Sequence, residues 1–168
     1  TTLTLEAYQA AGGIRGAAAR TAEDTYATLT GPQQELAEDV FLRLTALGEG
    51  TEDTKRRIEL DELDAGADLD AVLEAYVGAR LVTVDGSTIE IAHEALIRSW
   101  PRLRGWLTED RDGLRVHRQL TDASAIWESL DRDPGALYRG IRLATAREWS
   151  TAHRLGSREA AFLEASTA

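Results

Sequence analysis

With 168 residues, 43% of them hydrophobic, the chain is long enough to form one domain or two small ones around a sizeable core. It contains no cysteine, which excludes disulfides, thiolate metal sites and a cysteine nucleophile. The formal net charge is -10 and is unevenly distributed: residues 1–92 hold 7 basic and 18 acidic side chains, whereas residues 93–168 hold 12 and 11.

Helix-forming residues dominate and long β-branched runs are missing, which predicts a mainly α fold class. The apolar runs are too short to cross a bilayer, and the N-terminal TTLTLEAYQ lacks the basic start and apolar centre of a signal peptide. We therefore expect a soluble, cytoplasmic protein with no membrane partner. Methionine is absent even from position 1, so we also expect a piece of a longer protein.

Three helices are predicted in the first 48 residues. Residues 3–11 can be capped by Thr4 and end at Gly12-Gly13, and a second helix runs from residue 14 to about residue 29. A third helix begins at Gly31-Pro32, since proline is tolerated in a first helical turn, and extends to Gly48. The apolar positions that define the second and third helices are Ile14, Ala18, Ala22, Tyr26 and Leu29, then Leu36, Val40, Leu44 and Leu47.

Short strands and helices alternate in the next segment. We predict a strand over residues 55–60, a brief helix over 61–63 and a helix over 68–79. Residues 81–84 and 88–92 form a β-hairpin, because Asp85-Gly86 supplies the positive φ that a tight turn needs. The order of elements over residues 32–92 predicts a winged helix-turn-helix with a β-hairpin wing, flanked by helical segments.

The pattern after the hairpin is helical to the end of the chain. We expect a helix that begins at His93-Glu94, then a second long helix, a helix opened by Asp133-Pro134, and a last helix capped by Ser157. The expected buried positions are Leu96, Trp100, Leu103 and Leu107; Val116, Leu120, Ala123, Trp127 and Leu130; Leu137, Ile141 and Ala144; and Phe162 and Leu163. Paired antiparallel helices are the expected arrangement.

A winged helix suggests DNA binding, but the charges oppose it. A DNA reader needs Lys and Arg on its recognition helix and wing to neutralise phosphates. Here the expected recognition helix carries Asp68, Asp70 and Glu74 against Arg80 alone, and the wing adds further carboxylates. DNA is therefore an unfavoured partner, and a DNA-binding module of a transcription regulator is the alternative function.

The pair His93-Glu94 lies where the hairpin passes into a helix. A zinc protease would need a second histidine four residues on, where Ile97 stands, and His117 and His153 have no ligand-like spacing, so no metal site is expected. One interpretation is that His93 caps the helix or bonds nearby backbone. The other is that its ring meets an anion at this corner.

Three further clusters have structural explanations. Gly12-Gly13-Ile14-Arg15-Gly16 follows a predicted helix and not a strand, so a dinucleotide fingerprint is unsupported. Lys55-Arg56-Arg57 flanks an expected edge strand, where charge discourages aggregation. Arg98, Arg102 and Arg104 lie on the polar side of a predicted helix, a normal solvated face. Contact with a partner stays open for both basic clusters.

The run RLVTVDGSTIEIAHEALIRSWPRLRGWL, with EDRDGLRVHRQLTDASAIW and DPGALYRGIRLATAREW after it, resembles the region that follows the NTPase core in bacterial STAND-type signalling ATPases. These are NB-ARC-like relatives of the apoptotic and plant-immunity switch proteins. The opening LTLEAYQAAGGIRGAAARTAEDTYATL resembles the helical lid segment that precedes the winged helix there. The likeness covers nearly the whole chain, and HEALIRSWPRL is its most specific part.

The resemblance implies a division of the chain and a mechanism. Residues 1–29 would be the end of the lid segment, residues 30–107 the winged-helix domain, and residues 108–168 a helical domain or linker. In STAND proteins a histidine at the end of the last winged-helix strand reaches the β-phosphate of bound ADP and holds the closed, inactive state. The matching residue here is His93.

The resemblance also implies partners: the NTPase core of the same chain and a downstream WD-repeat or other sensor domain. Lys55, Arg56 and Arg57 are candidate contacts to that core. The chain has no Gly-rich P-loop, no acidic strand end for magnesium and no base, so we expect it to be no enzyme by itself. ADP or ATP with magnesium would belong to the parent protein, and this segment would need no cofactor of its own. Gly13-Ile14-Arg15 lacks the proline of the family's Gly-x-Pro, so no adenine contact is assigned.

Overall fold

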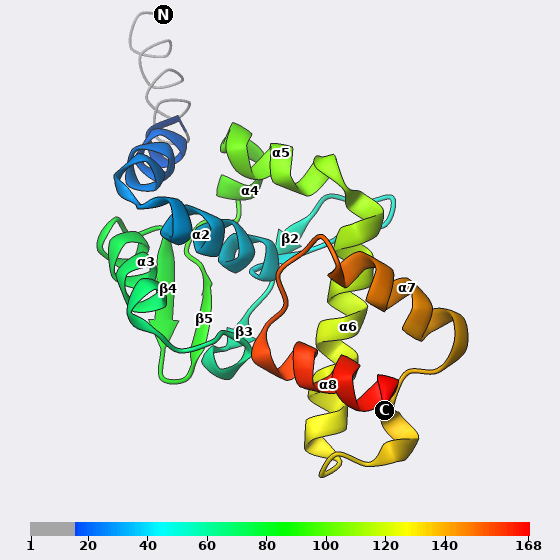
Figure 1. The fold of residues 1–168 in the computed structure, drawn as a ribbon. Coiled ribbons are helices and arrows are strands. Elements are labelled where there is room, and N and C mark those ends of the chain that lie inside the picture. Colours follow the sequence, from blue (N-terminus) through cyan, green and yellow to red (C-terminus); the bar gives the residue numbers. More distant parts are fainter. Residues whose placement is uncertain (1–15) are drawn as a thin grey trace, which may run out of the picture. The chain divides into compact units, whose positions relative to one another are not determined.

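The computed structural model describes residues 16–168, so the predicted helix over residues 3–11 and the glycines at 12 and 13 lie outside the described residues. The chain divides into two compact units, residues 1–109 and residues 110–168. Helices dominate both units, and the first unit also contains two small antiparallel sheets (Figure 1). The predicted mainly α class with a β-hairpin is confirmed.

Two helices open the first unit, one over residues 16–28 and α2 over Gly31–Arg43. Thr30 caps α2: its hydroxyl accepts from the amide of Gln33, while the Gln33 side chain accepts from the amide of Thr30. The predicted start of this helix is therefore confirmed, with Pro32 in the first turn. Its predicted end at Gly48 is wrong, because Thr45–Ala46 (β1) leaves the helix to pair with Thr54–Lys55 (β2).

The loop between β1 and β2 depends on glycine. A Cβ added at Gly48 would collide with the backbone of Thr51 and Glu52, and Gly50 has a φ of +73°. Glycine avoids the collision at position 48 because it has no Cβ, and it adopts the positive φ at position 50 without strain. The predicted helix fails here because Gly48 lies in the loop over residues 47–53 and not at a helix end.

The second sheet has three strands in the order β3-β5-β4, formed by Ile58–Glu59, Thr88–Ile91 and Val82–Asp85. Between β3 and β4 lie a short 3-10 helix, η1 (Leu60–Glu62), and α3 (Ala67–Gly78). Gly86 has the positive φ that the sequence predicts, 61°, and stands first in the two-residue turn of the hairpin, whereas Asp85 belongs to β4. The predicted strand over 55–60 is in fact two strands, which belong to different sheets.

A proline divides the region that follows the hairpin. The helix expected from His93 onward is two helices, α4 (Leu96–Ser99) and α5 (Pro101–Glu109). Trp100 between them has an extended backbone, because the ring of Pro101 disfavours a helical conformation in the residue before it. All four predicted apolar residues, Leu96, Trp100, Leu103 and Leu107, are nevertheless buried.

Aromatic rings form the centre of the first unit. Phe41 of α2 lies edge-on to Tyr76 of α3 and to Trp100, with ring centroids 4.8 Å and 5.1 Å apart. Tyr76 is 1% exposed, Phe41 and Trp100 not at all. This packing fixes α2, α3 and the junction of α4 and α5 against one another.

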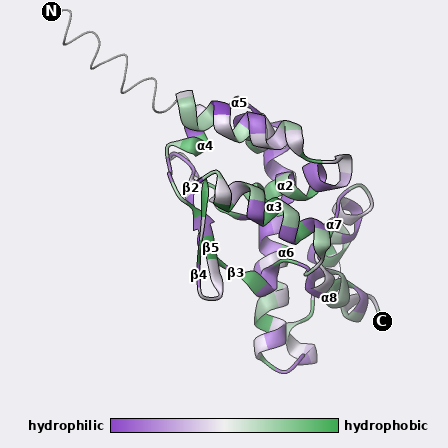
Figure 2. Cartoon of the chain, turned by 90° about the vertical axis from the view of Figure 1, so that its left-hand side faces the viewer, coloured by the Kyte–Doolittle hydropathy of each residue, from purple (hydrophilic) through white to green (hydrophobic). Residues whose placement is uncertain are grey.

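The second unit consists of α6 (Arg111–Ser129), a 3-10 helix η2 (Pro134–Ala136), α7 (Gly140–Ser150) and α8 (Ser157–Thr167). Hydrophobic and hydrophilic residues are interleaved along α6, as expected of a helix with one buried face (Figure 2). The hydrophobic core of the second unit consists of Leu120, Trp127, Tyr138, Ala146, Phe162 and Leu163.

Several predicted details of this unit are wrong. Leu130 and Ile141, expected in the core, are 51% and 85% exposed. Asp133-Pro134 opens only η2, and α7 begins later, at Gly140. Gly156 rather than Ser157 stands at the N-cap of α8.

Candidate functional site

The end of β5 is fixed by buried side chains and by a backbone hydrogen bond. Ile89 and Ile91 are 1% and 0% exposed, and the amide of Ala92 donates to the carbonyl of Leu81 at 2.9 Å. The chain then turns, with the amide of Leu96 donating to the carbonyl of His93 at 2.9 Å. Such bonds between residues three apart make a tight turn, and this is why α4 starts at Leu96 and not at His93.

The imidazole of His93 is exposed at this turn. Within residues 16–168 no hydrogen bond or ion pair engages its ring, and no side chain caps α4. The ring is therefore not a cap, and its nitrogens are available to an external group. An imidazole can donate to an anion from one nitrogen when neutral and from both when protonated.

The side chain of Glu94, unlike that of His93, bonds to another part of the first unit. Its Oε2 accepts from the backbone amide of Lys55 at 3.1 Å, which ties the turn after β5 to β2. The sequence predicts Glu94 in the first turn of a helix, but Glu94 precedes α4 and bonds to a strand. It therefore stiffens the corner that carries His93.

The predicted basic cluster separates into two environments. Lys55 Nζ and Arg57 Nε lie 3.6 Å and 3.7 Å from Oε2 of Glu90, on a partly exposed surface. Arg56 instead points inward, where Nη1 and Nη2 donate to both oxygens of Glu62 at 3.0 Å and 2.9 Å. Of the three, Lys55 and Arg57 offer their charge outward, and contact with an NTPase core stays a prediction for the cluster.

Sequence reasoning missed the buried network around Arg56. Its Nη1 also donates to the carbonyl of Arg43, and the Arg43 side chain, 3% exposed, pairs with Asp39 at 2.9 Å and Glu62 at 3.3 Å. No local pattern reveals it, because the partners are up to 19 residues apart. Only the i,i+4 spacing of Asp39 and Arg43 could have suggested one pair.

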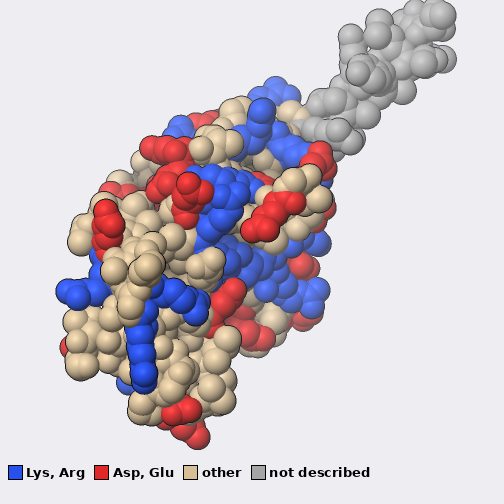
Figure 3. All heavy atoms as spheres, turned by 90° about the vertical axis from the view of Figure 1, so that its right-hand side faces the viewer, with Lys and Arg blue, Asp and Glu red and all other residues tan. Residues whose placement is uncertain are grey.

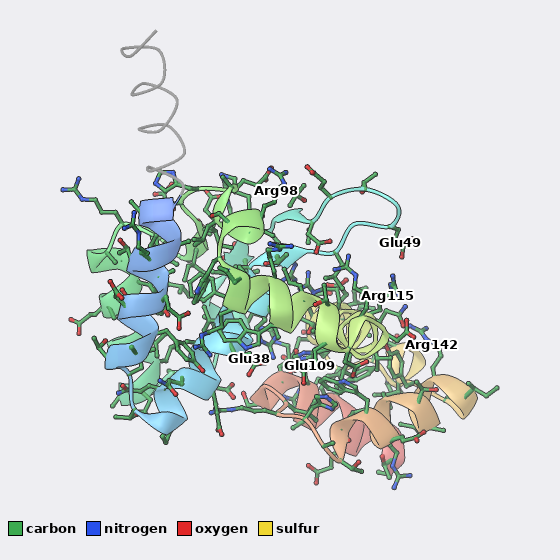
Figure 4. The ribbon with its side chains drawn as sticks, turned by 90° about the horizontal axis from the view of Figure 1, so that it is seen from above. Glu38, Glu49, Arg98, Glu109, Arg115 and Arg142 are labelled. Atoms are coloured by element: carbon green, nitrogen blue, oxygen red, sulfur yellow. The ribbon has the colours of Figure 1, made fainter. Side chains whose placement is uncertain are left out.

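Arg98 and Arg102 of the second basic cluster form ion pairs, so they are more than a solvated helix face. Arg98, which extends from α4 at the surface (Figure 4), pairs with Glu52 of the β1–β2 loop at 2.8 Å. Arg102 at the start of α5 binds the carboxylate of Glu23, from the helix of residues 16–28. Both arginines thus join segments that are far apart in sequence.

The charges of α3 agree with the argument against DNA. Asp68, Asp70 and Glu74 are all exposed on this helix, and Asp85 is exposed at the tip of the hairpin. Figure 3 views the molecule from the side away from α3, and on that face Lys and Arg side chains are interspersed with Asp and Glu. A phosphate backbone approaching α3 would meet repulsion.

Residues 16–168 hold neither a candidate metal cluster nor a candidate membrane span. That part of the chain holds no group of three or more His, Cys, Asp or Glu side chains able to bind a metal ion. The rings of His117 and His153 both pack against the Trp149 ring, at centroid distances of 4.6 Å and 4.5 Å, but each has its own polar partner. In the same residues no helix combines the length and apolarity needed to cross a membrane.

The sequence matches the family described as Novel STAND NTPase 1 over residues 1–135. That range covers the whole first unit and the second unit as far as η2. No curated protein and no solved structure gives a match.

Proposed function

Since the chain belongs to the Novel STAND NTPase 1 family, we propose that it is a regulatory, non-catalytic segment of a STAND NTPase. In this proposal residues 30–107 are a winged-helix domain, preceded by the end of a helical lid and followed by a helical domain or linker. The segment holds the ADP-bound, inactive state of a neighbouring NTPase core. It relays the nucleotide state to sensor or effector domains.

The observation that carries the proposal is the free imidazole of His93. The ring is exposed, has no partner among the described residues and projects from a turn whose flanking backbone is fixed. An imidazole N–H donates to a phosphate oxygen, and the bond is stronger when the ring is protonated. Because ADP would be contacted in one state and absent in the other, the contact would bias a two-state element.

The described residues suit a phosphate contact better than a metal contact. They supply an imidazole donor at the corner and no cluster of carboxylates for magnesium. ADP or ATP with magnesium would therefore be held by the core, which would supply the phosphoryl chemistry. This chain's own contribution is to orient His93 and to dock.

The test uses the longer protein that includes the NTPase core. His93→Ala is expected to release ADP faster and to raise basal NTPase activity. The matched control is His153→Ala, another exposed histidine, which bonds to the carbonyl of Trp149 and should leave both quantities unchanged. Unchanged ADP retention and basal activity in His93→Ala would overturn the proposal.

A further inference from the structure

One carboxylate joins the helix of residues 16–28 to α5. Oε1 of Glu23 accepts from Trp100 Nε1 at 3.0 Å and from Arg102 Nε at 2.9 Å, while Oε2 accepts from Arg102 Nη2 at 2.7 Å. The partners are 77 and 79 residues away in sequence. A two-point bond between a guanidinium and a carboxylate fixes both distance and orientation.

Aromatic rings support this contact. The Arg102 guanidinium lies over the Tyr26 ring at 4.2 Å, so it is held between Glu23 and Tyr26 of the same helix. The Trp106 ring is 5.7 Å from Tyr26 and 5.4 Å from Trp100. Glu23 and Arg102 are themselves partly exposed, at 44% and 38% of their side chains, and the aromatic rings beside them hold the guanidinium in place.

The other contacts of the helix of residues 16–28 bury little apolar area. Its buried apolar side chains are Ala19 and Ala22, which bury little area. Besides the Glu23 contact, the Tyr26 ring packs against Trp106, and Gln34 Nε2 donates to the carbonyl of Tyr26 at 3.1 Å. The attachment of the helix therefore depends strongly on Glu23.

A short, rigid run of backbone connects this contact to His93. The amide of Leu96 donates to the His93 carbonyl, and the amide of Trp100 donates to the Leu96 carbonyl at 3.0 Å. Leu96 is 1% exposed and Trp100 is fully buried, so neither can shift independently of the core. Displacement of the Trp100 indole would be transmitted along α4 to the turn that holds the imidazole.

We propose that Glu23 is a positioning residue, which couples the helix of residues 16–28 to the orientation of the His93 turn through Trp100 and Arg102. This inference rests on the proposed function, because it assigns the control of the same imidazole. When the helix is docked, the turn presents His93 in one orientation. When the helix moves away, the indole and guanidinium lose their acceptor and the turn is released.

The first experiment measures the attachment in the 168-residue chain, without nucleotide. In Glu23→Gln, amide hydrogen exchange of residues 16–28 is expected to accelerate by about tenfold or more, since local opening becomes easier. Asp24→Asn, an exposed neighbour on the same helix, should leave the exchange unchanged. Equal exchange in Glu23→Gln and the unsubstituted chain would overturn the inference.

The second experiment measures ADP release in the longer protein that includes the NTPase core, for Glu23→Gln, His93→Ala and the double variant. Glu23→Gln is expected to speed release when His93 is present and to add nothing in the His93→Ala background. Equal acceleration in both backgrounds would overturn the positioning role alone. A His93→Ala variant without effect would overturn the proposed function itself, whatever the exchange data show.

Discussion

Nε2 of His117 lies 2.9 Å from Oε1 of Glu159, and this contact joins α6 to α8 in the interior of the second unit. Both residues are buried, at 9% and 2% exposure. Glu159 also accepts from the hydroxyl of Thr121 and from the amide of Gly156 at 3.0 Å. A carboxylate out of water is tolerated here because several donors surround it.

Glu159→Ala should therefore destabilise the second unit. The substitution removes an acceptor from several buried donors, and we expect the free energy of unfolding to fall by about 3 kcal/mol. Urea unfolding followed by tryptophan fluorescence measures the change. Glu164→Ala, an exposed glutamate on the same helix, should change it by less than about 0.5 kcal/mol. Similar losses in the two variants would contradict the role of the buried network.

Two neighbouring arginines should contribute very differently to the free energy of unfolding. Arg56→Ala breaks the two-point bond to Glu62 and the bond to the Arg43 carbonyl, and we expect a loss of about 2 kcal/mol in the free energy of unfolding. Arg57→Ala removes only a loose, exposed pair with Glu90 at 3.7 Å and should cost less than about 0.5 kcal/mol. Thermal unfolding of both variants checks this, and equal shifts would refute the distinction.

The sequence predicted well where local chemistry decides the outcome. The Gly86 turn, the Pro32 helix start and the apolar positions Leu96 to Leu107 follow from turn geometry, capping and period. It predicted poorly where distant partners decide. Thr45 leaves a helical pattern because Lys55 pairs with it, and the inward turn of Arg56 depends on Glu62.

The candidate site shows the same division. The corner after the hairpin was predictable from the period change at residues 91–93, and the structure leaves the His93 ring exposed there. That Glu94 would bond to the amide of Lys55, 39 residues earlier, was not predictable from spacing. The contact of Glu23 with Trp100 and Arg102 was missed for the same reason.

A chain ending at residue 135, where the family match ends, should not keep the second unit folded. Trp127 of α6 packs edge-on against Phe162 of α8 at 5.7 Å, and Phe162 packs against Tyr138 at 5.0 Å. Without α7 and α8 the apolar face of α6 has no cover. We expect loss of helical circular dichroism from α6 and a red-shifted Trp127 emission. Native-like helicity per residue in the shortened chain would contradict this.

The 168-residue chain should not shift duplex DNA in a gel at low salt. The exposed carboxylates of α3, Asp68, Asp70 and Glu74, repel phosphate where a recognition helix would need cations. A variant with these three residues changed to Asn, Asn and Gln is the informative control, since its weaker repulsion should raise any non-specific binding. Sequence-specific binding by the unsubstituted chain would favour the transcription-regulator alternative.

The contact of Glu23 with Arg102 should persist well below pH 4.5, the usual pKa of a glutamate side chain. The hydrogen bond from Arg102 is the main cause that lowers the pKa of Glu23 from 4.5 to about 2, aided by the Trp100 bond and opposed by burial. A carboxylate whose pKa is lowered in the folded state contributes its full stability at pH values above its unfolded pKa. That contribution is lost as the pH falls through about 2.

The indole N–H resonance of Trp100 reports this titration directly, because its Nε1 donates to Glu23. We expect its chemical shift to stay constant from neutral pH down to about 4.5 and to move only as the pH falls toward 2, provided circular dichroism shows a folded chain. In Glu23→Gln the same resonance should not titrate. A midpoint near 4.5 in the unsubstituted chain would mean that Arg102 does not hold the carboxylate in solution.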